Sequence, residues 1–149
     1  MIPSAKSEKT MRNILISPIK AVINEIESST AFYILCSSHA WDNSAPNAVE
    51  LHFLDTKDKT NPFAFKPSHA SIILEFFLST PRDADIFICC DSGESRSAAI
   101  AAALRQYQGQ SDSEIWNSKE YHPNSLVYEI CCEAFGVNPR ADNRKDNSA

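Results

Sequence analysis

A single strand–loop–helix junction constrains this chain more than any other feature of its sequence. The apolar run DIFICC is followed by the polar stretch DSGES and then by RSAAIAAAL, which is rich in alanine and strongly helical. A fully apolar strand of this kind is typical of the centre of a parallel sheet. Residues 91–95 therefore join the carboxyl end of a buried strand directly to a helix that begins at residue 96.

The rest of the chain alternates between strand and helix patterns. Apolar runs bounded by polar breaks predict strands at residues 13–16, 31–36, 49–54 and 85–90. Helical spacing and capping residues predict helices at residues 18–27, 67–79, 96–108, 111–119 and 125–135. Ser17 and Pro18 are expected to cap and open the first of these helices, and Asn124 to cap the last.

This alternation favours an α/β fold with a single domain. We expect a central, mostly parallel sheet of about four strands, flanked by helices. The domain is predicted over residues 12–137, between a flexible N-terminus (1–11) and a polar tail (138–149). Ligands of such sheets bind beyond the carboxyl ends of the strands, which is where the loop after Cys90 is expected to lie.

Charge and apolar content limit the partners of the chain. The net charge of -5 gives no overall attraction for nucleic acid or for an anionic membrane. No apolar run approaches the roughly 18 residues that would span a bilayer, and the opening MIPSAKSEKTMRN lacks the apolar core of a signal peptide. We therefore expect a cytoplasmic protein without a nucleic-acid or membrane partner.

Cysteine usage agrees with a reducing compartment. The chain has five cysteines, an odd number, and four of them form two pairs of sequence neighbours. A secreted disulfide framework has a different pattern, and the absence of a CxxC spacing disfavours a structural zinc site. The sequence thus predicts reduced thiols, no metal and no cofactor.

The residues of the junction loop indicate phosphate chemistry. Five residues separate Cys90 from Arg96, and a loop of this length, if tightly wrapped, turns its backbone N–H groups inward around an anion. The following helix adds its positive end, and Arg96 can grip two phosphate oxygens at once. Gly93 provides a positive φ or a close approach in the middle of the loop. The residues expected to bind phosphate are Asp91, Ser92, Gly93, Glu94, Ser95 and Arg96.

The same positive field acts on the Cys90 thiol. Lowering its pKa produces a thiolate near neutral pH, and a thiolate beneath a bound phosphate monoester is placed for in-line attack on phosphorus. A merely buried thiol at this position would leave Gly93, Arg96 and Ser97 unexplained together.

The segment Cys90-x5-Arg96-Ser97 resembles the signature loop of the protein tyrosine and dual-specificity phosphatases. The stretch CDSGESRSAAIAAAL is especially similar to small bacterial and phage-type members of that superfamily. The resemblance is close over residues 85–104 and looser over residues 49–77 and the stretch YHPNSLVYE. It implies a phosphatase fold and hydrolysis of phosphomonoesters through a phosphocysteine intermediate on Cys90.

The resemblance also implies roles for other residues. Ser97 corresponds to the hydroxyl that helps the thiolate leave in the second step. The family's general acid is an aspartate that follows an upstream strand, and the LHFLD segment ends at Asp55. Asp58 is the alternative acid, and Asp42 beside Trp41 is a third candidate.

Two departures bear on activity and substrate. Cys89 stands where the family usually has a histidine, which affects the nucleophile's pKa and the rate. Asp91 and Glu94 place negative charge on a loop where phosphoinositide phosphatases carry lysines, so a polyanionic lipid headgroup would be repelled. The expected partner is a phosphorylated protein or another small phosphomonoester.

Two other functions compete with hydrolysis. A weakly active or inactive module could use the same loop to read phosphorylated partners without turnover. A rhodanese-type sulfur transferase also places a cysteine loop after a strand, but its chemistry calls for neither Arg96 nor Ser97.

Overall fold

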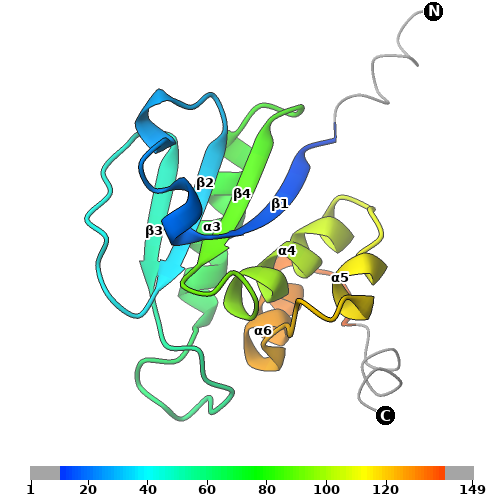
Figure 1. Ribbon diagram of the computed structural model, residues 1–149. Coiled ribbons are helices and arrows are strands. Elements are labelled where there is room, and N and C mark those ends of the chain that lie inside the picture. The colour runs from blue at the N-terminus through cyan, green and yellow to red at the C-terminus, as the bar shows by residue number, and fades with distance from the viewer. Residues whose placement is uncertain (1–10, 140–149) are drawn as a thin grey trace, which may run out of the picture.

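The computed structural model of the chain describes residues 11–139, which form a parallel sheet flanked by helices (Figure 1). The strands of this part of the chain are β1 (Asn13–Pro18), β2 (Phe32–Ser37), β3 (Ala48–His52) and β4 (Asp85–Cys90). All adjacent pairs are parallel, in the order β1-β4-β2-β3. The predicted α/β fold with a central sheet of about four strands is confirmed.

The helices cover both faces of this sheet unequally. They are α2 (Ile19–Val22), α3 (Pro67–Ser79), α4 (Arg96–Tyr107), α5 (Ser113–Asn117) and α6 (Ser125–Phe135), with a 3₁₀ turn η1 (Ile26–Ser28). The longer helices α3, α4 and α6 pack on one face, whereas α2 and η1 lie on the other, in front of the sheet in Figure 1.

Alternation along β4 sends neighbouring side chains into two separate cores. Ile86, Ile88 and Cys90 are buried in the core shared with α3, α4 and α6. Cys89 faces the opposite way and is buried in the smaller core with α2 and η1. The two adjacent cysteines therefore have different surroundings.

The prediction of a helix over residues 18–27 is wrong in its first residue and in its length. Pro18 is the last residue of β1, in register with Cys90, and has the extended φ of -72° and ψ of 150°. Helix α2 begins only at Ile19 and ends at Val22. Proline is tolerated at the end of this edge strand because its missing N–H is not needed for the ladder. The periodic residues Ile19, Val22 and Ile26 are still buried, over two short turns, and Ile23 is half-buried beside them.

Other boundaries differ from the prediction by at most two residues. The predicted strand 49–54 is β3, which ends at His52, and the predicted helix 111–119 is reduced to α5. Phe53 still donates its N–H to the Ser37 carbonyl, after which the backbone leaves the sheet. Most of the predicted flexible N-terminus and polar tail lies outside the described residues. None of the helices within residues 11–139 is long and apolar enough to cross a membrane.

The register brings the carboxyl ends of the central strands together. Cys90 is paired with Pro18 on one side and with Cys36 on the other. Ser37 is in turn paired with His52. The segments that follow β2, β3 and β4 consequently meet at one edge of the sheet, where the predicted site residues lie.

Candidate active site

The loop between β4 and α4 is folded back over the end of its own strand. Gly93 has a φ of +73°, which favours glycine, and its backbone is buried. A Cβ at this position would lie 2.6 Å from the Pro18 nitrogen, so a side chain would collide with the end of β1. The predicted need for glycine is confirmed, and the close neighbour is the chain itself.

Three hydrogen-bonding groups surround the Cys90 sulfur. The backbone N–H of Gly93 donates to Sγ at 3.3 Å, and the N–H of Ser97 donates at 3.4 Å. The Ser97 hydroxyl oxygen lies 3.2 Å from the same sulfur. Donors that come three and seven residues after the cysteine require a curled loop, with the sulfur on its concave side.

These contacts stabilise the thiolate. Burial by itself raises the pKa of Cys90. Hydrogen bonds from the Ser97 hydroxyl and N–H, and then from the Gly93 and Ser95 N–H groups, outweigh burial and hold the pKa below the ordinary value of a thiol. The amino end of the 12-residue helix α4 adds positive potential at the same place.

The other cysteines near the site are not activated in this way. Burial, followed by the charge of Cys90, raises the pKa of Cys89. Burial likewise raises the pKa of Cys36, which is the register partner of Cys90 on β2 and faces the same core. Cys90 is thus set apart from its neighbours by hydrogen bonds, because all three thiols are buried.

Arg96 is held at the start of α4 by groups from three other segments. Its Nη1 donates to the Phe53 carbonyl at 2.8 Å and to the Ser38 hydroxyl at 3.2 Å. Its Nη2 donates to Asp91 Oδ2 at 3.1 Å. The Nε group is buried and has no hydrogen-bond partner among residues 11–139. The buried Nε groups of Trp41 and Arg105 are in the same state, and each such donor costs about 1–3 kcal/mol unless a ligand or water satisfies it.

Asp91 links this arginine to the end of β2. Its Oδ1 accepts from the Ser37 hydroxyl at 2.8 Å, while Oδ2 accepts from Arg96. Burial raises the pKa of Asp91, but the hydrogen bonds from Ser37 and Arg96 and the positive charge of Arg96 outweigh it and lower the pKa. Asp91 therefore remains an anion beside the arginine and orients its guanidinium.

Asp55 reaches the junction loop, as the family resemblance implies for a general acid. Its Oδ1 accepts from the Ser95 hydroxyl at 2.9 Å and from Asn124 Nδ2 at 2.7 Å. Asp55 as a whole residue is exposed to solvent. It thus lies on the rim of the loop that contains Cys90 and Arg96.

The alternative acids lie elsewhere. Asp58 is exposed, and its Oδ1 accepts from the Thr60 hydroxyl at 2.6 Å and from the Thr60 N–H at 3.0 Å. These two bonds lower the pKa of Asp58. Among residues 11–139, no hydrogen bond joins Asp58 to residues 90–97. Asp42 lies between β2 and β3 at a φ of +56°, and within the described residues no hydrogen bond joins it to residues 90–97.

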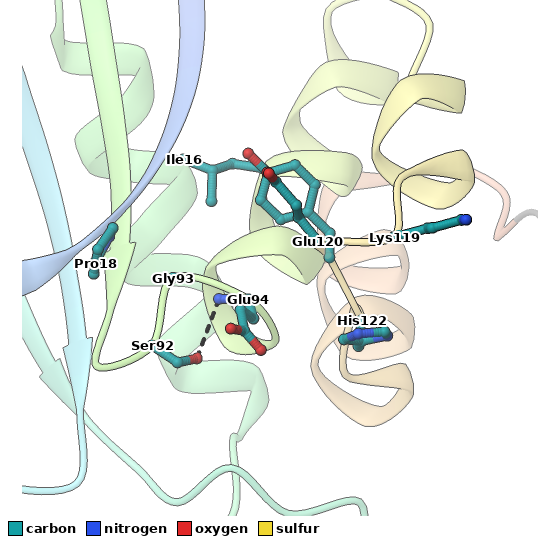
Figure 2. Close-up of a pocket in the computed structure, with 9 residues that line it drawn as sticks. Ile16, Pro18, Ser92, Gly93, Glu94, Lys119, Glu120 and His122 are labelled. Carbon is teal, nitrogen blue, oxygen red and sulfur yellow. Dashed lines mark hydrogen bonds between the residues drawn. The ribbon is translucent and has the colours of Figure 1, made fainter.

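The remaining loop residues, Ser92 and Glu94, are exposed. The Glu94 N–H donates to the Ser92 hydroxyl at 3.2 Å, and both residues line a cavity of ≈ 490 Å³ (Figure 2). The cavity lies between the end of β1, the junction loop and residues 119–122. Within residues 11–139 no group of three or more His, Cys, Asp or Glu side chains is arranged to hold a metal.

Several residues that build the site cannot be recognised from the sequence. Ser37, Ser38 and the Phe53 carbonyl carry no chemical signal in the sequence, because only the strand register brings them to Asp91 and Arg96. Asn124 was identified solely as a helix cap. Its position in the stretch YHPNSLVYE, which resembles the family loosely, was the one available signal.

Comparisons of sequence find no relative. No family model matches the chain, and no curated protein matches it.

Comparisons of structure find phosphatases. PTPMT1 in complex with PI(5)P superposes with a TM-score of 0.54 at 12% identity, over 92% of this chain and 95% of that chain. A second PTPMT1 structure gives a TM-score of 0.47 at 13% identity, over 83% and 90%. P. aeruginosa TpbA gives a TM-score of 0.48 at 12% identity, over 92% and 87%. The first of these superpositions shows that the chain has a phosphatase-like fold, as the signature loop predicts.

Proposed function

We propose that this protein is a cysteine-dependent phosphomonoester hydrolase of the protein tyrosine or dual-specificity phosphatase type. The observation that carries the proposal is the convergence of the Gly93 and Ser97 N–H groups and the Ser97 hydroxyl on the Cys90 sulfur. A loop that stabilises a thiolate in this way also offers inward N–H groups to the phosphate above it.

The first step transfers the phosphoryl group to the enzyme. The loop N–H groups, Arg96 and the positive end of α4 hold the phosphate oxygens. The buried Nε of Arg96 supplies a donor that no residue of the described chain uses. The Cys90 thiolate attacks phosphorus as the bond to the ester oxygen breaks, and Asp55 gives its proton to that oxygen.

The second step returns the enzyme to its starting state. The Asp55 carboxylate takes a proton from a water molecule that attacks the phosphocysteine. The S–P bond breaks, inorganic phosphate is released, and the electron pair of the bond returns to Cys90 as a thiolate. The Ser97 hydroxyl, 3.2 Å from the sulfur, donates a hydrogen bond to this leaving group.

Charge around the loop bears on the substrate. PTPMT1 binds PI(5)P, a phosphomonoester, in its solved complex. In the present chain Asp91 and Glu94 add negative charge to the loop, and Glu94 is exposed at its rim. These carboxylates repel a headgroup with several phosphates, which supports a phosphoprotein or a small monoester as substrate.

One observation favours a module that binds phosphate without turnover. Cys89 occupies the position of the family's histidine and is buried in the opposite core, so the hydrogen bonds of a histidine to the loop are absent there. A metal-free assay on phosphotyrosine, phosphoserine, phosphoinositide and RNA 5′-phosphate substrates separates the two functions. Hydrolysis supports the phosphatase, whereas tight binding of phosphate without hydrolysis supports the module.

Asp55→Asn and Asp58→Asn will differ in their effect on hydrolysis. Loss of the general acid at Asp55 should lower kcat/KM on phenyl phosphate by about 10²–10⁴-fold, the usual contribution of such a group. Asp58→Asn should change it by less than about twofold, because Asp58 hydrogen bonds only within its own turn. Steady-state kinetics of the two variants side by side measures the difference, and the reverse order would assign the acid to Asp58.

A further inference from the structure

Asn124 connects three segments at the rim of the candidate site. The residue is 2% exposed. Its Nδ2 donates to Asp55 Oδ1 at 2.7 Å and to the Thr56 carbonyl at 3.2 Å, whereas its Oδ1 accepts from the Val127 N–H at 3.0 Å. One buried amide thus ties the segment of the acid to the first turn of α6.

The backbone of Asn124 closes a ring with the junction loop. Its N–H donates to the Ser95 carbonyl at 3.2 Å, and the Ser95 hydroxyl donates to Asp55 Oδ1. Asp55, Ser95 and Asn124 are therefore each bonded to the other two. Helix α6, whose first turn Asn124 caps, packs against both α3 and α4, so the ring is supported by the core.

The orientation of the Asn124 amide follows from its two hydrogen bonds, one to the backbone of α6 and one to Asp55. Because Oδ1 must accept the Val127 N–H to cap α6, the amide nitrogen has to face Asp55. Serine, threonine or aspartate would cap the helix equally well. Aspartate has no donor for a carboxylate, and the single hydroxyl of serine or threonine ends one bond nearer the backbone than the amide nitrogen of asparagine. Asparagine therefore caps the helix with one atom and reaches the Asp55 carboxylate with another.

The two donors leave the Asp55 oxygens unequal. Both side-chain hydrogen bonds that described residues make to Asp55, from Ser95 and from Asn124, end on Oδ1. In the protonated acid that the proposed function requires, the oxygen that accepts two such bonds acts as the carbonyl oxygen, which leaves Oδ2 to carry the proton. The geometry consequently keeps Oδ2 available for the leaving-group oxygen.

From this ring we propose that Asn124 is a positioning residue, which fixes the side chain of Asp55 over the loop with Oδ2 presented to the substrate. The inference rests on the proposed phosphatase activity and on Asp55 as its acid. It assigns to Asn124 a role in protonating the leaving group, in addition to its role as a helix cap. Removing the donor should therefore weaken acid catalysis more than it weakens phosphate binding.

The test is the sensitivity of Asn124→Ser to the leaving group. Serine preserves the cap, but its hydroxyl is one bond shorter than the asparagine amide and is taken up by the cap, so the donor to Asp55 is withdrawn. We compare kcat/KM on phenyl phosphate, whose basic leaving group needs a proton, with kcat/KM on p-nitrophenyl phosphate, whose leaving group does not. We expect kcat/KM of Asn124→Ser to fall by about tenfold on phenyl phosphate and by less than about twofold on p-nitrophenyl phosphate. The first value is smaller than the full contribution of a general acid, because Asp55 itself is still present. In an Asp55→Asn background the same substitution should change neither value further.

A matched control separates this role from general stability. Asn47 also donates its side-chain amide to backbone carbonyls, at 2.9 Å to Ile26 and 3.0 Å to Ala31, but on the other side of the sheet. Asn47→Ser should leave the ratio of kcat/KM on phenyl phosphate to kcat/KM on p-nitrophenyl phosphate unchanged. This ratio is measured on one preparation and does not depend on the fraction of folded protein, so a destabilised variant is still informative.

The outcomes distinguish the two proposals. An active wild type whose Asn124→Ser variant loses equally on both substrates, or loses nothing, would overturn the positioning role alone. The same holds if the losses of Asn124→Ser and Asp55→Asn are additive. A wild type without turnover on either substrate would overturn the proposed function, and the positioning role with it.

Discussion

Cys90→Ser will abolish turnover and leave the binding of phosphate intact. A serine hydroxyl is not ionised near neutral pH, whereas the loop and Ser97 hold the pKa of Cys90 below its ordinary value. Removal of a nucleophile of this kind lowers kcat by about 10⁴-fold or more. Steady-state assays on p-nitrophenyl phosphate measure the loss, and calorimetric titration with inorganic phosphate should give a Kd within about threefold of wild type, because the N–H groups and Arg96 remain.

The neighbouring cysteine provides the control. Cys89→Ser makes the same chemical change one residue earlier, in the core with α2 and η1. It should lower the free energy of unfolding by about 1–3 kcal/mol, the cost of burying a hydroxyl, with activity per folded molecule within a few-fold of wild type. Equal loss of activity in Cys90→Ser and Cys89→Ser would show that the loss comes from disturbed packing around β4 and not from removal of a nucleophile.

Arg96→Ala will remove both phosphate binding and turnover. The substitution deletes the only side-chain cation in the loop of residues 90–96 and leaves the Asp91 carboxylate, now unpaired, beside the phosphate. We expect kcat/KM of Arg96→Ala to fall by about 10³-fold or more. In Arg96→Lys we expect kcat/KM to fall by about 10²-fold, because lysine keeps the positive charge but lacks the planar guanidinium that binds two oxygens. Kinetics and phosphate titration on both variants measure these effects.

Arg105, on the same helix, is the matched control. It is also buried, forms an ion pair with Glu114 and donates to the Ile14 carbonyl at 3.1 Å, but it lies away from the loop. Arg105→Ala should destabilise the fold without a specific loss of phosphate affinity. If Arg105→Ala and Arg96→Ala lowered phosphate affinity alike, the cation at residue 96 would have no special part in binding.

The sequence was most informative where chemistry and local structure coincide. The strand Asp85–Cys90, the glycine-containing loop and the helix from Arg96 were predicted within one residue, because fully apolar and alanine-rich segments have strong local preferences. Helix α6 and its Asn124 cap were likewise predicted, since the cap and Gly136 mark both of its ends.

Local pattern failed where tertiary pairing decided the conformation. Pro18 and the apolar spacing after it favour a helix, but the ladder with β4 extends the backbone through Pro18. The strand after residue 48 ends at His52 because its next carbonyl, that of Phe53, accepts from Arg96 and not from another strand. Strand β4 is far from Pro18 in the sequence, and Arg96 is far from Phe53. A short stretch of sequence therefore does not show where β1 and β3 end.

The same limit applies to the site. Asp55 was favoured over Asp58 from its position after a strand, and the structure adds its contacts with Ser95 and Asn124. Ser37, Ser38 and Asn124 could not be assigned to the site from sequence, because strand register and helix packing bring them there. These residues have no distinctive chemistry until their partners are known.

The most direct measurement of the central claim is the detection of a phosphoryl group on Cys90. In Ser97→Ala, the hydroxyl 3.2 Å from the sulfur is lost, so breakdown of the intermediate slows and the phosphoenzyme accumulates. The variant is quenched in alkaline denaturant during turnover of p-nitrophenyl phosphate and analysed by mass spectrometry. We predict one phosphoryl group on the peptide that contains Cys90, and none when Cys90→Ser is added. Sustained turnover with no phosphorylated cysteine, or with the phosphoryl group on another residue, would contradict the account.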